Sequence, residues 1–110
     1  MKLYLDTSTP VTILRLDDEE YQWESKRDLA KHLLKFIADK LDENDISWKD
    51  ITEIHFFSGP GSFTGLRIGA VVVNTLADQL SVPLYDHKGK RQEIILPEYG
   101  KPANTTAPKN

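Results

Sequence analysis

An eleven-residue segment with four glycines constrains the fold more than any other part of the sequence. Residues 59–69 read Gly-Pro-Gly-Ser-Phe-Thr-Gly-Leu-Arg-Ile-Gly. The alternating residues 53–58 before the segment predict a strand, and the apolar residues within 63–80 predict a helix. Ser62 suits the N-cap of that helix, and Pro83 favours its end a few residues earlier. The sequence therefore predicts a strand, a glycine turn and a helix in direct succession.

The four glycines have separable roles. Gly59 and Gly61 permit a tight turn that exposes backbone N–H groups at a helix N-terminus, a geometry that binds anions. Gly65 and Gly69 are one helical turn apart, so they let another backbone or helix approach closely. The alternative is a structural turn followed by close packing of the helix on a sheet.

The residues around this segment predict an α/β fold. Residues 2–6 and 11–16 are typical of two hairpin strands, residues 21–23 of a third, and residues 83–85 of a late strand. Between them, 28–41 carry apolar residues at helical spacing. This order predicts one lobe with a mixed five-stranded sheet, antiparallel at first and then extended by parallel strands through helical crossovers.

The chain is predicted to form one domain, because 110 residues support a single core. We place the lobe at 1–86 and a C-terminal arm at 87–110. The apolar residues 94–96 are predicted to pair as a last short strand or to pack as an arm. The polar residues 101–110 are predicted to form a flexible tail.

Composition argues against several classes of protein. A net charge of −3 is unfavourable for a stand-alone nucleic-acid binder, so any contact with RNA is predicted to run through a partner. No apolar run approaches the ~20 residues that cross a bilayer, and no cysteine is present. We therefore predict a cytoplasmic protein without a membrane association. The three histidines lack a metal-ligand spacing, and the sequence indicates neither a metal site nor a catalytic residue.

A second polar cluster follows the first predicted strand. An aspartate followed by hydroxyls in a tight turn can hydrogen-bond phosphate oxygens, and it can equally close a hairpin as a structural turn. Together with the glycine turn, it defines a candidate anion or nucleotide loop that comprises Asp6, Thr7, Ser8, Gly59, Gly61 and Ser62.

The predicted helix 63–80 is apolar around more of its circumference than one sheet can cover, since its only charged residues are Arg67 and Asp78. The helix in 28–41 has a spare apolar stripe beside its core face. Either the two helices cover each other, or they form a protein interface. The residues predicted for that interface are Leu34, Ala38, Phe63, Gly65, Leu66, Arg67, Ile68, Gly69 and Val72. A Gly65→Leu variant is then expected to lose partner binding and keep its fold.

Two motifs resemble the TsaB (YeaZ) family: Leu-Asp-Thr-Ser-Thr at 5–9 and the glycine-rich segment at 59–69. The resemblance extends over residues 2–85, and Pro97-Glu98-Tyr99 is similar to a Pro-x-Tyr segment near the C-terminus of the family. It implies a ribonuclease H-like lobe of the actin-like ATPase type. It also implies a non-catalytic scaffold and dimerisation subunit in the synthesis of threonylcarbamoyladenosine on tRNA.

The resemblance implies that catalysis belongs to a separate protein, TsaD, and that TsaE hydrolyses ATP. It therefore implies a TsaD-like partner, a TsaE-like ATPase in the same complex, and contact with tRNA only through the complex. No cofactor is expected for the chain alone, although adenine nucleotide could lie at the partner interface. The second lobe of the family is expected to be absent, because residues 86–89 lead almost directly to 94–97.

Two other functions stay open at this stage. One is a small nucleotide-binding phosphotransferase or hydrolase of the actin-like ATPase superfamily, which would use Asp6, Thr7 and the Gly59 turn. A single lobe lacks the cleft that such enzymes form between two lobes, which disfavours this alternative. The other is a self-contained homodimeric interaction module, with the two helices at a two-fold axis.

Overall fold

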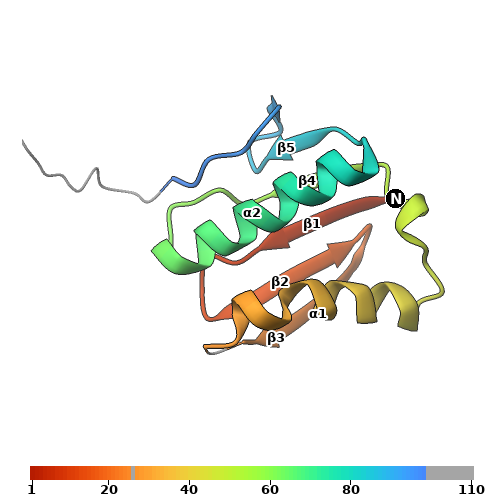
Figure 1. The fold of residues 1–110 in the computed structure, drawn as a ribbon, viewed down its shortest axis with the longest axis horizontal. Helices are drawn as coiled ribbons and strands as arrows, with labels where there is room; N and C mark the ends of the chain where they lie inside the picture. The colour runs from red at the N-terminus through yellow and green to blue at the C-terminus, as the bar shows by residue number, and fades with distance from the viewer. Residues whose placement is uncertain (26, 99–110) are drawn as a thin grey trace, which may run out of the picture.

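A mixed six-stranded sheet with the order β3-β2-β1-β4-β5-β6 forms the centre of the computed structural model, which describes residues 1–25 and 27–98 (Figure 1). The elements are β1 (Lys2–Asp6), β2 (Val11–Leu16), β3 (Glu19–Glu24), α1 (Leu29–Glu43), the 3₁₀ turn η1 (Trp48–Asp50), β4 (Glu53–Phe56), α2 (Phe63–Leu80), β5 (Leu84–Asp86) and β6 (Arg91–Gln92). β1 pairs antiparallel with β2 and parallel with β4, and β5 continues the parallel part.

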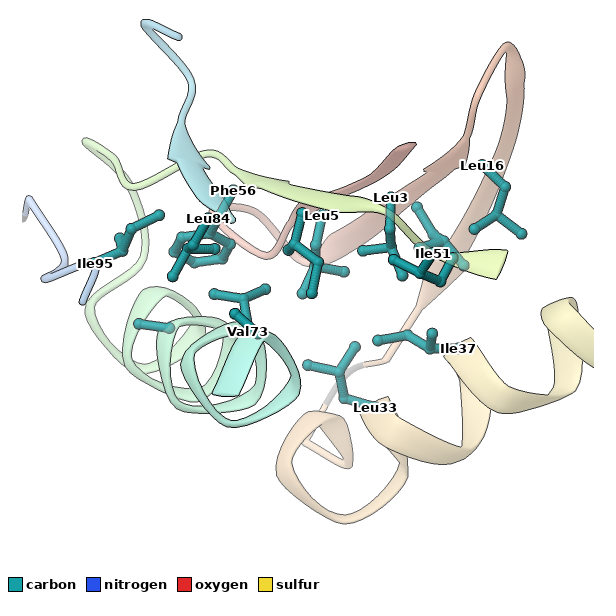
Figure 2. Close-up of a cluster of buried hydrophobic side chains, with 14 of the residues drawn as sticks. Leu3, Leu5, Leu16, Leu33, Ile37, Ile51, Phe56, Val73, Leu84 and Ile95 are labelled. Atoms are coloured by element: carbon teal, nitrogen blue, oxygen red, sulfur yellow. The ribbon is translucent and has the colours of Figure 1, made fainter. Parts of the chain in front are cut away.

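Both helices cover the same face of the sheet (Figures 1 and 2). Alternate strand residues such as Leu3 and Leu5 point to this face and are fully buried. α1 contributes Leu33 and Ile37, which lie opposite the sheet in Figure 2. The full set of buried apolar side chains from the helices is Leu29, Leu33, Ile37, Leu41, Leu66, Ala70, Val73 and Ala77. The α/β class and the helix over 63–80 are confirmed.

The prediction of five strands was wrong, because Arg91–Gln92 adds a sixth strand. These two residues pair antiparallel with β5 after a tight turn. A two-residue strand has no hydrophobic period, so the sequence pattern could not show it. The sheet thus continues beyond residue 86, and the division of the chain into 1–86 and 87–110 stays a prediction.

Residues 94–98 pack as an arm, one of the two alternatives expected for this segment. Ile95 is buried in the core. The Asn74 side chain on α2 binds the backbone of Ile95 twice, since its Nδ2 donates to the carbonyl oxygen at 3.0 Å and its Oδ1 accepts from the amide at 2.9 Å. The predicted tail at 101–110 lies outside the described residues.

Asp86 holds the turn between β5 and β6. Its Oδ1 accepts the backbone N–H groups of Lys88 and Lys90, at 3.0 and 2.9 Å, and its Oδ2 accepts from Gln92. The hydrogen bond from the Lys90 amide is the main reason that the pKa of Asp86 lies below its ordinary value. The ionised carboxylate therefore stabilises the turn.

We expect this stabilisation to disappear in acid. A depressed folded-state pKa means that the stabilisation is complete above the ordinary aspartate pKa of about 3.9 and is lost as the pH falls through the lower folded value. The NMR shifts of the Lys88 and Lys90 amides should therefore titrate together below about pH 4. Asp86→Asn should abolish that titration. A midpoint at or above the ordinary aspartate value would contradict the prediction.

Candidate functional site

The turn after β1 and the start of α2 lie against each other. Ser62 caps α2 as predicted, with its Oγ accepting the Gly65 amide at 3.2 Å. The Ser62 amide in turn donates to the carbonyl oxygen of Ser8 at 2.8 Å. Thr7 is fully buried, and its Oγ1 donates to the carbonyl oxygen of Gly65 at 2.6 Å. The two sequence motifs therefore form one internal junction.

Gly65 and Gly69 serve this junction. A β-carbon at Gly65 would lie far inside contact distance of the Thr7 carbonyl oxygen. At Gly69 it would overlap the Thr7 hydroxyl and come within 2.6 Å of the Phe56 ring. The close approach that the glycines allow is thus between α2 and its own sheet.

This placement corrects part of the predicted interface. Gly65 and Gly69 are buried, and Leu66 is 0% exposed because it points into the core. None of the three can meet a partner on the surface of this structure. The expectation that Gly65→Leu spares the fold was also wrong, since the side chain has no space.

The structure brings Asp6, Thr7 and Ser8 beside Gly61 and Ser62, as the candidate anion loop requires. Their polar groups, however, already bind one another. Asp6 Oδ1 accepts from the amide and the hydroxyl of Ser8, at 2.8 and 2.6 Å. With the amide of Ser62 also engaged, these contacts are typical of a structural turn. Anion or nucleotide binding here stays a prediction.

Gly59 lies apart from that junction and beneath the C-terminal arm. A β-carbon there would overlap the carbonyl oxygen of Glu98. The preceding Ser58 donates its hydroxyl to Glu98 Oε2 at 3.1 Å, and its amide donates to His87 Nδ1 at 3.2 Å. No local sequence pattern predicts this cluster, because His87 and Glu98 are 29 and 40 positions away from Ser58.

The remaining predicted interface residues lie toward the outer side of the two helices. Leu34 on α1 is 52% exposed, and Phe63 on α2 is 57% exposed. Arg67 is exposed, with its guanidinium 5.8 Å from the centre of the Phe63 ring. Ala38, Ile68 and Val72 are half-buried.

These helices border a groove of about 330 Å³. Val71, which is 65% exposed, lines it and was absent from the predicted interface. The signal for it was present, since residues 63, 67 and 71 recur at the four-residue spacing of one helix face. The residues that line the groove are Ala30, Phe63, Thr64, Arg67, Ile68, Val71 and Val72.

Across residues 1–25 and 27–98, no three or more histidines and carboxylates lie together in a way that could hold a metal ion. In the same part of the chain, neither helix has the length and apolar character needed to cross a membrane.

Comparisons with known proteins agree with this architecture. The family model described as TsaD, tRNA N6-adenosine threonylcarbamoyltransferase, matches residues 23–86. The chain is 32% identical over 87 residues to the tRNA threonylcarbamoyladenosine biosynthesis protein TsaB of Bacillus subtilis, covering 74% of this chain and 38% of that protein. With TsaB of Haemophilus influenzae it shares 33% identity over 86 residues, covering 74% and 36%.

Among solved structures, YeaZ from Pseudomonas aeruginosa superimposes with a TM-score of 0.68 at 35% identity, over 77% of this chain and 42% of that one. The mixed sheet, the two helices on one face and the glycine junction thus define an α/β lobe of the TsaD-related class. Within that class, the chain belongs to the TsaB/YeaZ family. It spans about two fifths of the length of the relatives in this comparison.

Proposed function

We propose that this chain is a non-catalytic scaffold subunit that binds a TsaD-like enzyme in the threonylcarbamoyladenosine modification of tRNA. The observation that carries the proposal is the outer face of the two helices, where Leu34, Phe63 and Val71 are each more than half exposed. Phe63 and Val71 line the groove, and large exposed apolar side chains on one surface are typical of protein interaction sites.

The chemistry of this face suits a protein partner. Phe63 and Val71 offer apolar area that a second helix can cover. Arg67 lies over the Phe63 ring and can form an ion pair at the rim of the same contact. Aromatic residues and arginine are enriched in protein interfaces.

Family membership supports the pathway. The relatives in Bacillus subtilis and Haemophilus influenzae are named for tRNA threonylcarbamoyladenosine biosynthesis. The resemblance to TsaB adds a ribonuclease H-like lobe, a cytoplasmic location, a TsaD-like catalyst and a TsaE-like ATPase. In this proposal the chain itself carries no catalytic residue or cofactor, and any adenine nucleotide lies at the interface with the partner.

Light scattering of the chain, alone and with the TsaD-like protein of the same organism, tests the proposal. We expect a new 1:1 or 2:2 species. Leu34→Asp and Val71→Asp should each weaken it at least about 10-fold, because a carboxylate would be buried without a partner in the contact. The matched control is Leu96→Asp, since Leu96 is 74% exposed and lies on the arm.

The outcome also separates the alternatives. A stable homodimer that ignores the TsaD-like protein and is broken by Val71→Asp would replace the scaffold function with a self-contained module. Equal weakening by Leu96→Asp would show that the outer face of the two helices is not the contact. A thermal shift that depends on Mg-ATP in the chain alone would instead favour the nucleotide-binding alternative.

A further inference from the structure

Among the described residues that line the groove between α1 and α2, Arg67 is the one with a charge, and the others are apolar except for Thr64. Phe63, Arg67 and Val71 recur every four residues on one face of α2, with Arg67 in the middle. A partner that covers Phe63 and Val71 therefore also covers Arg67 and removes water from its guanidinium group.

The exposed Arg67 guanidinium pairs with no carboxylate in residues 1–25 and 27–98, since the ion pairs of this part of the chain involve other side chains. Its contact is with the Phe63 ring, whose centre lies 5.8 Å from the guanidinium carbon. This contact uses the face of the ring and leaves the five N–H donors of the guanidinium to other acceptors. The donors can therefore bind a group that comes from outside the chain.

The surroundings of Arg67 favour a negative charge. Both helices begin at the same end of the sheet, and their first turns contribute Ala30 and Thr64 to the groove (Figure 1). Neither first turn contains an acidic residue, and the N-terminus of a helix favours an anion. The carboxylates of Glu24 and Asp28 line a separate pocket between β3 and α1. The groove is thus apolar with a positive centre.

We propose that the partner presents an aspartate or glutamate side chain on an apolar helix face, and that its carboxylate pairs with Arg67 as the helix covers Phe63 and Val71. A guanidinium that is shielded from water without an acceptor is costly, whereas a carboxylate can bind it through two parallel hydrogen bonds. Because this pair is planar, it fixes the direction of the partner helix as well as its position. The inference rests on the proposed function and specifies the chemistry of the partner.

A second copy of the chain suits the groove less well than a different protein does. In a two-fold contact the same surface of both copies meets, so both Arg67 side chains would enter one interface. The residues that line the groove supply no carboxylate to pair with them. Like charges brought together in a contact weaken it. Charge complementarity therefore favours an acidic partner over a second copy.

Isothermal titration calorimetry of the full chain with the TsaD-like protein of the same organism tests the proposal. We expect Arg67→Gln to weaken binding about 10-fold or more, because the partner's carboxylate would lose its cation. Arg67→Glu should weaken it further. The matched control is Lys49→Glu, which makes the same change of charge at an exposed position of η1 and should bind within about twofold of the original chain. Circular dichroism of each variant checks that the fold is retained.

A charge exchange identifies the carboxylate. Each aspartate and glutamate on the apolar helix faces of the TsaD-like protein is replaced by arginine in turn. One of these replacements should weaken binding of the original chain and restore binding of Arg67→Glu by about 10-fold or more. Loss of packing at Arg67 alone would not produce such a rescue.

Two results would overturn the inference and leave the scaffold function intact: a complex that Arg67→Gln forms with the original affinity, or no arginine replacement that restores binding of Arg67→Glu. A dimer of the chain alone that Arg67→Gln dissociates would also overturn it, because a second copy would then occupy the groove. If the original chain forms no complex with the TsaD-like protein, the scaffold function is itself wrong.

Discussion

A Gly65→Ala variant is expected to lose about 3 kcal/mol of the free energy of unfolding, which corresponds to a fall of about 15 °C in Tm. The new methyl group would overlap the backbone carbonyl oxygen of Thr7, which cannot rotate away as the end of a side chain could. Relief requires that α2 move away from β1. That movement would also lengthen the buried hydrogen bond from Thr7 Oγ1 to the Gly65 carbonyl oxygen.

Thermal unfolding followed by circular dichroism measures this effect. The matched control is Thr64→Ala, which changes the neighbouring, exposed position of α2 and should alter stability by no more than about 0.5 kcal/mol. Gly65→Leu should be more severe than Gly65→Ala. A Gly65→Ala protein with an unchanged Tm would show that the junction between Thr7 and α2 is looser than the structure describes.

Phe56→Ala should destabilise the chain by about 3–5 kcal/mol, because it removes a large, fully buried side chain. The ring lies between the sheet and α2, so close to Gly69 that a β-carbon there would come within 2.6 Å of it. Glycine at that position lets the helix pack on the ring, and the helix cannot collapse far into the space that the ring leaves. The cavity therefore persists, and its cost adds to the lost burial.

Urea denaturation measures this loss of stability. The midpoint of unfolding should fall, while the dependence of the unfolding free energy on urea concentration should stay unchanged. Phe57→Ala is the matched control, since Phe57 is the next residue along the chain and is only half-buried. It loses a ring contact with His87 and should cost clearly less. Equal losses in the two variants would contradict the placement of the core on the helix side of the sheet.

Much of the fold follows from local pattern. The alternation of Leu3 and Leu5 with polar neighbours predicts a strand with one buried face, and the structure confirms it. The spacing of Leu33, Ile37 and Leu41 likewise predicts the buried side of α1. Ser62 marks the start of α2 because a capping side chain acts on amides only a few residues away.

The candidate interface was predicted only in part. α2 carries more apolar residues than one face of a sheet can cover, which predicts that some of them stay exposed. Phe63, which is 57% exposed, confirms this prediction. The pattern could not tell which glycines face outward, since a helix with apolar residues nearly all round has no unique inner side. The direction of Gly65 and Gly69 depends on the turn at Thr7, far away in sequence.

The sequence by itself determined where strands and helices form, the cap of α2 and the resemblance to a family, because each depends on interactions between residues a few positions apart. The tertiary structure decided the sixth strand, the Ser58–His87–Glu98 cluster and the junction between Thr7 and the start of α2. These features join residues that are far apart in the chain. They exist only because strand pairing brings distant backbone segments into register, and no local preference of the chain contains that information.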